Sequence, residues 1–186
     1  SGFITDMGFE TYQKILAEAM EELGFETGIS SRSSGDNFVS DCTIETDQLA
    51  LIPDSYIDMT AEKIRIYKEL DSLTSEKDLI NMKNRLTDRF GKMPVELERL
   101  FDIVRIRQLG QKLGFEKIII KNGVMIAFFI TNPLSQYYRS DRFSKVLENV
   151  NLNPKLFEIK QPDGRLRIMV RNVDGISKAY DILKKL

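Results

Sequence analysis

The strongest structural signal in the chain is the stretch Phe115-Glu-Lys-Ile-Ile-Ile-Lys121-Asn122-Gly123-Val124-Met-Ile-Ala-Phe-Phe-Ile130. Asn-Gly between two runs of β-branched and aromatic residues is typical of a β-hairpin, because both residues accept the positive φ of a type I′ turn. The second run is apolar on both faces, which predicts a central strand covered by helices. The sequence therefore predicts strands at 115–121 and 124–130.

The chain after this hairpin continues the alternation of strands and helices. Strands are predicted at about 156–161 and 165–171, joined by the turn residues Pro162-Asp163-Gly164. A short helix is expected near 141–149 and a final helix at about 175–186. The residues predicted to face inward on the final helix are Ile176, Ala179, Tyr180 and Leu183.

Residues 60–113, upstream of the hairpin, have the periodicity of three helices. Ser75-Glu-Lys-Asp78 resembles a capping box that begins the second helix, and Pro94 suits the first turn of the third. The predicted inward stripes are Ile64, Tyr67, Leu70 and Leu73; Leu79, Met82, Leu86 and Phe90; and Leu97, Leu100, Phe101, Val104 and Leu113.

The N-terminal part divides the chain into regions. An amphipathic helix is predicted from Gly8 to Leu23, and the Ser- and Gly-rich stretch Thr27–Asn37 predicts a flexible linker. A strand pattern runs over Val39–Ile52, and Pro53 follows it. We therefore expect residues 1–25 to be a helical tail, 26–38 a linker and 39–186 one domain. The predicted fold class is α+β: a mixed or antiparallel sheet with covering helices, preceded by a detached helix and a flexible linker.

The composition excludes several kinds of active site. The chain has 186 residues, no histidine and one cysteine, Cys42. Sites that use imidazole and internal disulfides are therefore excluded. The sequence shows no apolar run of the ~20 residues that a membrane span needs and no signal peptide. We expect a cytoplasmic domain without membrane contact.

The formal net charge of -1 conceals a strong segregation of charge. Residues 1–59 carry a net charge of -10, residues 60–112 of +3 and residues 113–186 of +6. The first interpretation of such asymmetry is solvated surface. The alternative is a docking surface for a charged partner.

No catalytic or cofactor-binding motif is visible. Phosphate-binding glycine motifs are absent, and nothing in the spacing of the acidic groups requires them to converge on a metal ion or in a cleft. Cys42 lies in a strand pattern and is interpreted as a small core residue rather than a nucleophile. We predict no catalytic, cofactor-binding or metal-binding residues. The acidic groups considered are Glu21/Glu22, Asp41/Glu45/Asp47 and Asp54/Asp58.

The basic C-terminal part supports a second hypothesis, a nucleic-acid-binding module. Arg165, Arg167 and Arg171 share one face of a predicted strand, yet acidic residues interrupt this pattern and no aromatic-interleaved basic motif accompanies it. A solvated outer face of a sheet is the preferred interpretation, and direct DNA contact is not expected. The other basic residues considered are Lys155, Lys160, Lys184 and Lys185.

Three stretches together resemble the C-terminal TRCF domain of bacterial transcription-repair coupling factors (the Mfd family). The likeness covers about residues 1–25 and 40–121, and the order and spacing of the stretches make it specific. The first stretch resembles the segment that leaves the second motor domain of the family. The stretches are Gly2-x-Ile4 with Gly8-Phe9, Tyr12, Leu16 and Glu18-Ala19; Leu51-Ile-Pro-Asp-Ser-Tyr-Ile57 with Arg65–Leu70; and Asp88-Arg-Phe-Gly91 with Pro94 and Leu109–Gly114.

The resemblance implies a regulatory role in DNA repair. The parent protein would be an ATP-dependent DNA translocase that removes stalled RNA polymerase and recruits nucleotide excision repair. This domain would be non-catalytic. It would dock on the N-terminal UvrB-like module of the same protein and mask the surface that binds UvrA, which is autoinhibition. No cofactor is then expected in this chain, because ATP and Mg²⁺ belong to the parent motor.

The resemblance also suggests interface residues. In relatives, the helix that ends in Asp-Arg-Phe-Gly faces the N-terminal module through acidic side chains, and Asp88 matches this pattern. Position 85, often acidic in relatives, is Arg85 here, so the charge pairing is expected to differ. The alternative for Asp88 is local pairing with Arg85 or Lys92 at the surface. Pro53, Tyr56, Tyr67 and Phe90 are interpreted as architectural.

Overall fold

A computed structural model describes residues 38–186. The predicted helix at 8–23 and the linker at 27–37 lie outside these residues, so the division of the chain at residues 25 and 38 remains a prediction. The described residues form two compact units, one of residues 49–105 and one of residues 38–48 with 106–186. In the described part of the chain, no helix is long and apolar enough to cross a membrane.

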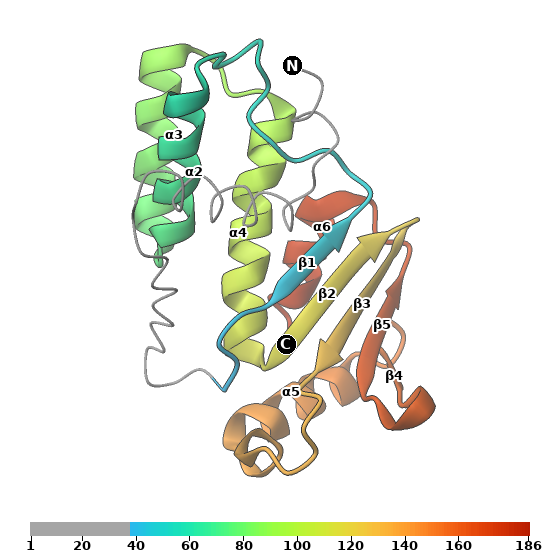
Figure 1. Cartoon of the computed structure of the whole chain (residues 1–186). Helices are drawn as coiled ribbons and strands as arrows, with labels where there is room; N and C mark the ends of the chain where they lie inside the picture. Colours follow the sequence, from blue (N-terminus) through green and yellow to red (C-terminus); the bar gives the residue numbers. More distant parts are fainter. Residues whose placement is uncertain (1–37) are drawn as a thin grey trace. The chain divides into compact units, whose positions relative to one another are not determined.

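The first unit is helical (Figure 1). It contains α2 (Thr60–Ser72), α3 (Glu76–Phe90) and the N-terminal part of α4 (Val95–Leu113), which continues into the second unit. All three predicted helices are confirmed. On α4, the predicted inward residues Leu97, Leu100, Phe101 and Val104 are at most 3% exposed.

The helix starts follow from local chemistry. The Ser75 hydroxyl accepts a hydrogen bond from the Asp78 N–H at 3.1 Å and so caps α3, as the sequence predicts. On α2 the predicted stripe is only partly right. Ile66 and Leu70 are buried, whereas Ile64 is half-buried. Lys63 is buried because its ammonium forms an ion pair with Asp54 in the preceding loop.

The predicted strand at 39–52 is too long. The observed strand β1 covers only Thr43–Thr46. The backbone beyond it bonds to helices instead: the Leu51 N–H donates to the Glu96 carbonyl at 3.2 Å, and the Ile52 N–H donates to the Tyr67 hydroxyl at 2.9 Å. A backbone whose donors are satisfied in this way forms no ladder.

Contacts of this loop agree with the architectural role predicted for Tyr56 and Tyr67. Besides the Tyr67 contact, the Tyr56 hydroxyl donates to the carbonyls of Leu86 and Gly91 at 3.0 and 2.9 Å. The rings of Tyr56 and Phe90 lie 5.8 Å apart. These contacts hold the loop, rather than a strand, against α3.

The second unit contains a mixed five-stranded sheet in the order β1-β2-β3-β5-β4. Strand β1 is parallel to β2, and the other neighbours are antiparallel. The predicted hairpin is confirmed, with Asn122 at φ 53° and Gly123 at φ 71°, and β3 is the central strand. The further strands are β2 (Phe115–Lys121), β3 (Val124–Phe129), β4 (Glu158–Lys160) and β5 (Arg167–Arg171).

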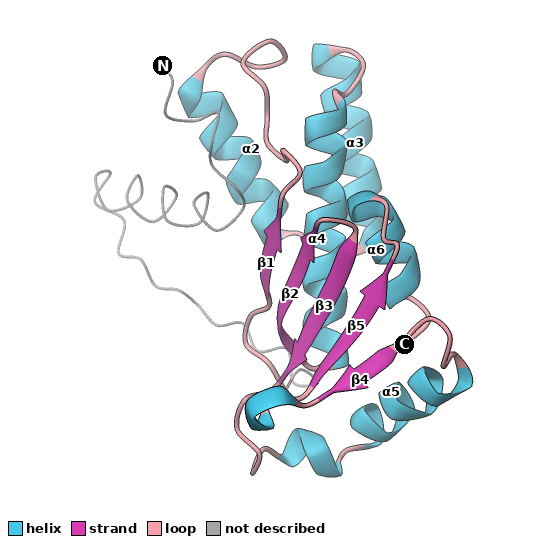
Figure 2. Cartoon of the chain, turned by 90° about the vertical axis from the view of Figure 1, so that its right-hand side faces the viewer, coloured by secondary structure: helices cyan, strands magenta, loops and turns pink. Residues whose placement is uncertain are grey.

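Helices of this unit cover one face of the sheet and leave the other open (Figure 2). Helix α6 (Gly175–Leu183) and the end of α4 lie behind the strands, and α5 (Asp141–Leu152) lies at one end. The expectation that β3 is covered on both faces is therefore wrong: its Met125 and Ala127 are buried, while Val124 and Ile126 are partly exposed. Side chains of α6 that face the core include Ile176, Ala179, Ile182 and Leu183.

Distant parts of the sequence complete this unit. The Gln48 side-chain oxygen accepts a hydrogen bond from the Ile176 N–H at 3.1 Å and satisfies a donor at the start of α6. At the other end of the sheet, Tyr137 is fully buried and donates its hydroxyl hydrogen bond to the Leu113 carbonyl. A β-carbon on Gly114 would lie 2.2 Å from the Tyr137 ring, so only glycine fits there.

Candidate docking surface

The outer side of α3 presents a narrow polar stripe. With 3.6 residues per turn, Lys77, Asn81, Asn84 and Asp88 lie opposite the buried side of the helix. All four are exposed, whereas Leu79, Met82 and Leu86 on the buried side are at most 6% exposed. We call Lys77, Asn81, Asn84 and Asp88 the α3 outer stripe.

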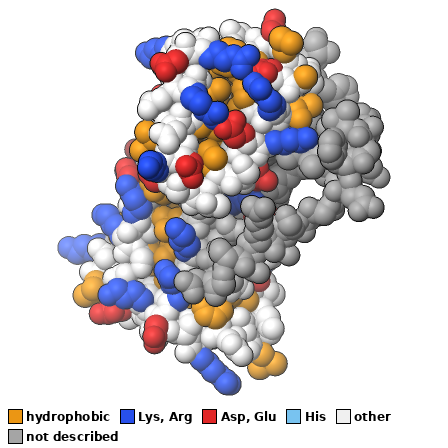
Figure 3. Space-filling model, turned by 90° about the vertical axis from the view of Figure 1, so that its left-hand side faces the viewer, with side chains coloured by type: hydrophobic (Ala, Val, Ile, Leu, Met, Phe, Trp, Pro, Cys, Tyr) orange, Lys and Arg blue, Asp and Glu red, His pale blue; other side chains and the backbone are white. Residues whose placement is uncertain are grey.

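An exposed apolar residue flanks the α3 outer stripe. Ile80 is 47% exposed and lies one helix position away from the buried Leu79. Figure 3 shows such apolar side chains interspersed with charged side chains of both signs over the helical unit. Ile80 is not among the residues predicted from the sequence to be functional, although the periodicity of Leu79, Met82 and Leu86 already places it outside the core.

Arg85 and Arg89 of α3 are engaged by carboxylates of α2. Arg85 forms an ion pair with Glu69, and Arg89 forms one with Glu62 at 2.7 Å. These pairs are exposed, and each contributes about 1 kcal/mol or less. Their structural consequence is that the positive charge of Arg85 is directed toward α2. The alternative considered for Asp88, local pairing with Arg85 or Lys92, is not observed among the described residues.

Asp88 is exposed and, within residues 38–186, has no ion pair or hydrogen bond from its side chain. It lies in the last turn of α3, where the negative end of the helix dipole disfavours a carboxylate by about 0.3–1 kcal/mol. Asp88 therefore does not stabilise its own helix. An unpaired carboxylate in such a position is available to a partner that presents a cation.

A second charge cluster joins α3 to α4 inside the first unit. Arg105 contacts Glu76 through two nitrogens at 2.8–3.0 Å and contacts Asp102 at 2.9 Å. Burial raises the pKa of Asp102, although Arg105 opposes this shift. The hydrogen bonds from Arg105 go to Glu76 of α3 and to Asp102 of α4 itself, so this cluster is interpreted as structural.

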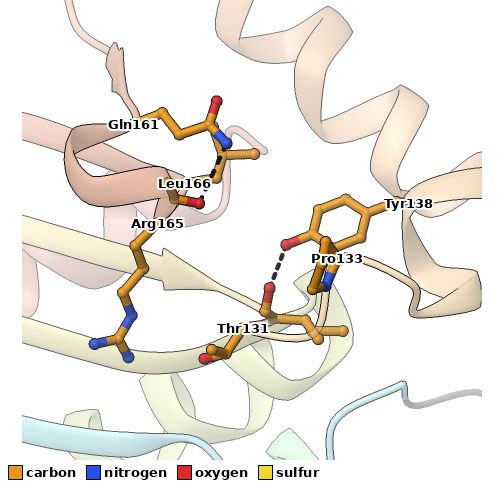
Figure 4. A pocket seen from close by; sticks show the side chains of 8 residues that line it. Thr131, Pro133, Tyr138, Gln161, Arg165 and Leu166 are labelled. Carbon is orange, nitrogen blue, oxygen red and sulfur yellow. Dashed lines mark hydrogen bonds between the residues drawn. The ribbon is translucent and has the colours of Figure 1, made fainter.

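The polar hollows of the second unit show no catalytic arrangement among the described residues. One, of about 220 Å³, includes Thr131, Tyr138, Gln161 and Arg165 in its wall (Figure 4). The other, of about 400 Å³, is lined by side chains that include Asp47, Gln48 and Lys121. In the first hollow, the exposed Thr131 hydroxyl donates a hydrogen bond to the Glu116 carboxylate at 2.7 Å. Residues 38–186 hold no cluster of three or more potential metal ligands.

Cys42 is a core residue, as predicted from its pattern. Its side chain is 1% exposed, and burial raises the pKa of its thiol. A neutral thiol without solvent access is a poor nucleophile.

The structure separates the basic residues of the C-terminal part. Arg167 and Arg171 share the open face of the sheet, as predicted, and Lys160 joins them through its register with Arg167. Arg165 precedes β5, which begins two residues later than predicted, and its guanidinium lies over Phe128. Arg171 and Lys160 contact Glu158 at 3.0 and 3.3 Å. Lys184 lies at the end of α6 and contacts Asp181 at 2.9 Å. The predicted basic stripe is therefore partly neutralised within the unit.

These features define a class: an α+β domain whose candidate functional feature is an exposed, charged helix surface. The comparisons identify it further. The profile of the TRCF domain family matches residues 46–140, which is about half of the chain, and the chain belongs to this family.

Curated relatives carry the name transcription-repair-coupling factor. The protein of Staphylococcus epidermidis is 34% identical over 172 residues, which cover 92% of this chain and 13% of the relative. The protein of Rickettsia typhi is 31% identical over 186 residues, which cover 98% of this chain and 15% of the relative. This chain thus corresponds to less than a sixth of the relatives' length.

A solved structure supports the fold. The crystal structure of the C-terminal domain of a transcription-repair coupling factor matches 78% of this chain and 88% of its own, with a TM-score of 0.65 and 18% identity. The family resemblance that the sequence motifs carry is confirmed, and so is the α+β fold class.

Proposed function

We propose that this chain is the non-catalytic regulatory domain of an ATP-dependent DNA translocase that couples transcription to nucleotide excision repair. In this proposal, it docks on the N-terminal UvrB-like module of its parent and masks the UvrA-binding surface. RNA polymerase, DNA and UvrA are partners of the parent, while ATP and Mg²⁺ are bound by the motor. Membership of the TRCF domain family supports the repair context.

The single observation that carries the docking proposal is the state of Asp88. The two arginines next to it on α3 are bound by carboxylates of α2, whereas the Asp88 carboxylate is exposed and unpaired within the described residues. Because its position opposes the helix dipole, helix stability does not explain its presence. A cationic partner surface does explain it.

The α3 outer stripe also has the chemistry of a releasable contact. Asn81 and Asn84 offer hydrogen bonds, and Lys77 and Asp88 offer one charge of each sign. The flanking Ile80 adds apolar area. Ile80 and Asp88 lie eight positions apart, which is about 12 Å along a helix. Exposed charge pairs contribute little each and weaken with added salt, which suits an autoinhibitory contact that has to open.

The test is a titration of the chain with the N-terminal module of its parent, followed by calorimetry at low salt. We expect binding whose affinity falls as salt is added. We expect Asp88→Lys to lower the affinity by about tenfold or more, because the substitution replaces attraction with repulsion. The matched control is Glu148→Lys, a charge reversal at an exposed position of α5, which is expected to leave binding unchanged.

A second arm addresses masking. If the domain covers the UvrA-binding surface, added domain competes with UvrA for the module, and Asp88→Lys competes less well. Absence of binding at low salt contradicts docking altogether. Binding without competition contradicts the masking part alone.

A further inference from the structure

The open face of the sheet carries an aliphatic row with a carboxylate at each end. The strand register aligns Glu45, Ile119, Ile126, Met169 and Glu158 across all five strands. The three apolar members are partly exposed, because none of the described helices of this unit covers them (Figure 2).

Four of the six cations around this row form ion pairs with its two carboxylates. Lys117 and Lys121 contact Glu45 at 2.6 and 3.4 Å. At the opposite edge, Lys160 and Arg171 contact Glu158 at 3.3 and 3.0 Å. Among residues 38–186, the two carboxylates of this row are thus each bound by two cations, and neither contacts the other two arginines of the face.

The other two arginines of the open face, Arg165 and Arg167, both stack on the ring of Phe128. Their guanidinium carbons lie 4.8 and 4.9 Å from the centroid of Phe128, which is 7% exposed beneath them. Neither arginine forms an ion pair with another described residue. The Arg167 Nε is buried and has no hydrogen-bond partner within the described residues.

A buried N–H without a partner is rare in proteins and indicates a missing acceptor. Stacking on Phe128 orients the two planar guanidinium groups, and such groups recognise a planar carboxylate through paired hydrogen bonds. Arg165 also forms one wall of the smaller hollow, opposite Pro133 and Tyr138 (Figure 4). Because Arg165 itself is exposed, the site is open toward solvent on that side.

We propose that Arg165 and Arg167, held on Phe128, bind a carboxylate of an acidic protein segment whose aliphatic side chains pack on Ile119, Ile126 and Met169. The segment belongs to a separate partner protein. The surface lies in the second unit and shares no residue with the α3 outer stripe, so the two proposals stand independently.

The chemistry favours a protein segment over single-stranded nucleic acid. Nucleic-acid surfaces of this kind use exposed aromatic rings, on which bases stack. Here the aromatic ring of the face, Phe128, is covered by arginines, and the exposed centre is aliphatic. Aliphatic side chains together with two cations suit a segment that mixes leucines with carboxylates.

The test uses a fluorescently labelled peptide, Leu-Asp-Glu-Leu-Leu-Asp-Glu, and the full chain, with anisotropy as the readout. The paired control peptide replaces Asp with Asn and Glu with Gln. We expect the acidic peptide to bind and the neutral one to bind at least about tenfold more weakly, and Arg165→Gln with Arg167→Gln to abolish this difference. The control variant is Arg139→Gln with Arg142→Gln, which removes two exposed cations outside the sheet.

Each outcome decides the proposal. Equal binding of the two peptides, no binding of either, or loss of the difference in the Arg139/Arg142 control overturns it. Tighter binding of oligodeoxythymidine that depends on the same two arginines overturns it in favour of a nucleic-acid site. If the double variant fails to fold, Arg165→Gln alone decides, because that side chain is exposed and its removal leaves the core intact; it is expected to reduce the acidic peptide's affinity several-fold.

Discussion

Gly110 of α4 lies directly against Cys42, the residue that precedes β1. A β-carbon on Gly110 would be 2.7 Å from the Cys42 sulfur and 3.1 Å from the Ile118 side chain. This close approach lets the end of α4 pack on the sheet, where Cys42 and Ile118 are at most 1% exposed. A glycine inside a helix costs about 1 kcal/mol relative to alanine, so its presence here reflects packing rather than helix propensity.

We therefore expect Gly110→Ala to lower the free energy of unfolding by about 1–3 kcal/mol, despite the better helix propensity of alanine. Truncation of the partner, Cys42→Ala, removes the clashing sulfur and leaves the Cys42 β-carbon at an ordinary 3.5 Å. The double variant should consequently be more stable than the sum of the two single effects predicts. Urea unfolding of all four proteins measures this coupling, and strict additivity would contradict the packing argument.

Glu45 of the short strand β1 forms ion pairs with two lysines of β2, Lys117 and Lys121. The hydrogen bond from the Lys117 ammonium, with help from Lys121, lowers the pKa of Glu45 below its ordinary value. A carboxyl with a lowered folded pKa stabilises the fold above its unfolded pKa, and this stabilisation is lost as the pH falls through the folded pKa. Glu45→Gln should thus cost less than about 1 kcal/mol at neutral pH, and the cost should vanish in acid below about pH 4.

The check on Glu45 is a set of urea unfolding curves from neutral to acid pH. The matched control is Glu148→Gln, an exposed carboxylate on α5 that contacts Lys145 at 3.6 Å. Its variant is expected to show little effect at any pH. A Glu45→Gln penalty that persists unchanged in acid would show that the side chain acts by packing and not by charge.

Asp102 is expected to show the opposite pH dependence. Burial raises its folded pKa, so the ionised form is disfavoured in the folded state and stability falls as the pH rises through the interval between the unfolded and folded pKa values. Asp102→Asn should remove this dependence. The loss of stability at neutral pH should be at most about 1 kcal/mol, because Arg105 keeps its paired contact with Glu76.

NMR titration of the Asp102 carboxyl and unfolding curves across acid pH test this prediction together. Arg105→Gln serves as the comparison, since it removes both carboxylate contacts and should raise the pKa of Asp102 further. A carboxyl that titrates below its ordinary range in the native protein would contradict the dominance of burial.

The sequence predicts those elements whose signals are local. The Asn122-Gly123 turn, the Ser75 cap and the apolar stripe of α4 each act within a few residues, and the structure confirms them. The strand at 39–52 fails because the backbone donors of Leu51 and Ile52 find acceptors on helices far along the chain.

The same distinction applies to the candidate sites. The position of Asp88 on the exposed side of α3 follows from helical spacing alone. The ion pair between Arg85 and Glu69 cannot be predicted in this way, because it forms only when α2 and α3 are neighbours. Likewise, the sequence placed Arg165 and Arg167 on one face, while only the strand register reveals that Phe128 lies beside them.

Substitution of Asp88 is expected to weaken docking without lowering the free energy of unfolding. Because its carboxylate lies at the negative end of α3 and has no partner among residues 38–186, Asp88→Asn should leave the free energy of unfolding unchanged or raise it by about 0.3–1 kcal/mol. The same substitution should weaken docking on the N-terminal module, since it removes the one charge that the α3 outer stripe offers near its end. Urea unfolding and calorimetric titration of the same preparation measure the two effects.

Asp78→Asn is the informative contrast: the Asp78 carboxylate accepts a hydrogen bond from Ser75 at the positive end of α3, so its loss should destabilise the domain and leave docking intact. A destabilising Asp88→Asn would place this carboxylate in the structure of the domain itself and remove the main argument for its role in docking.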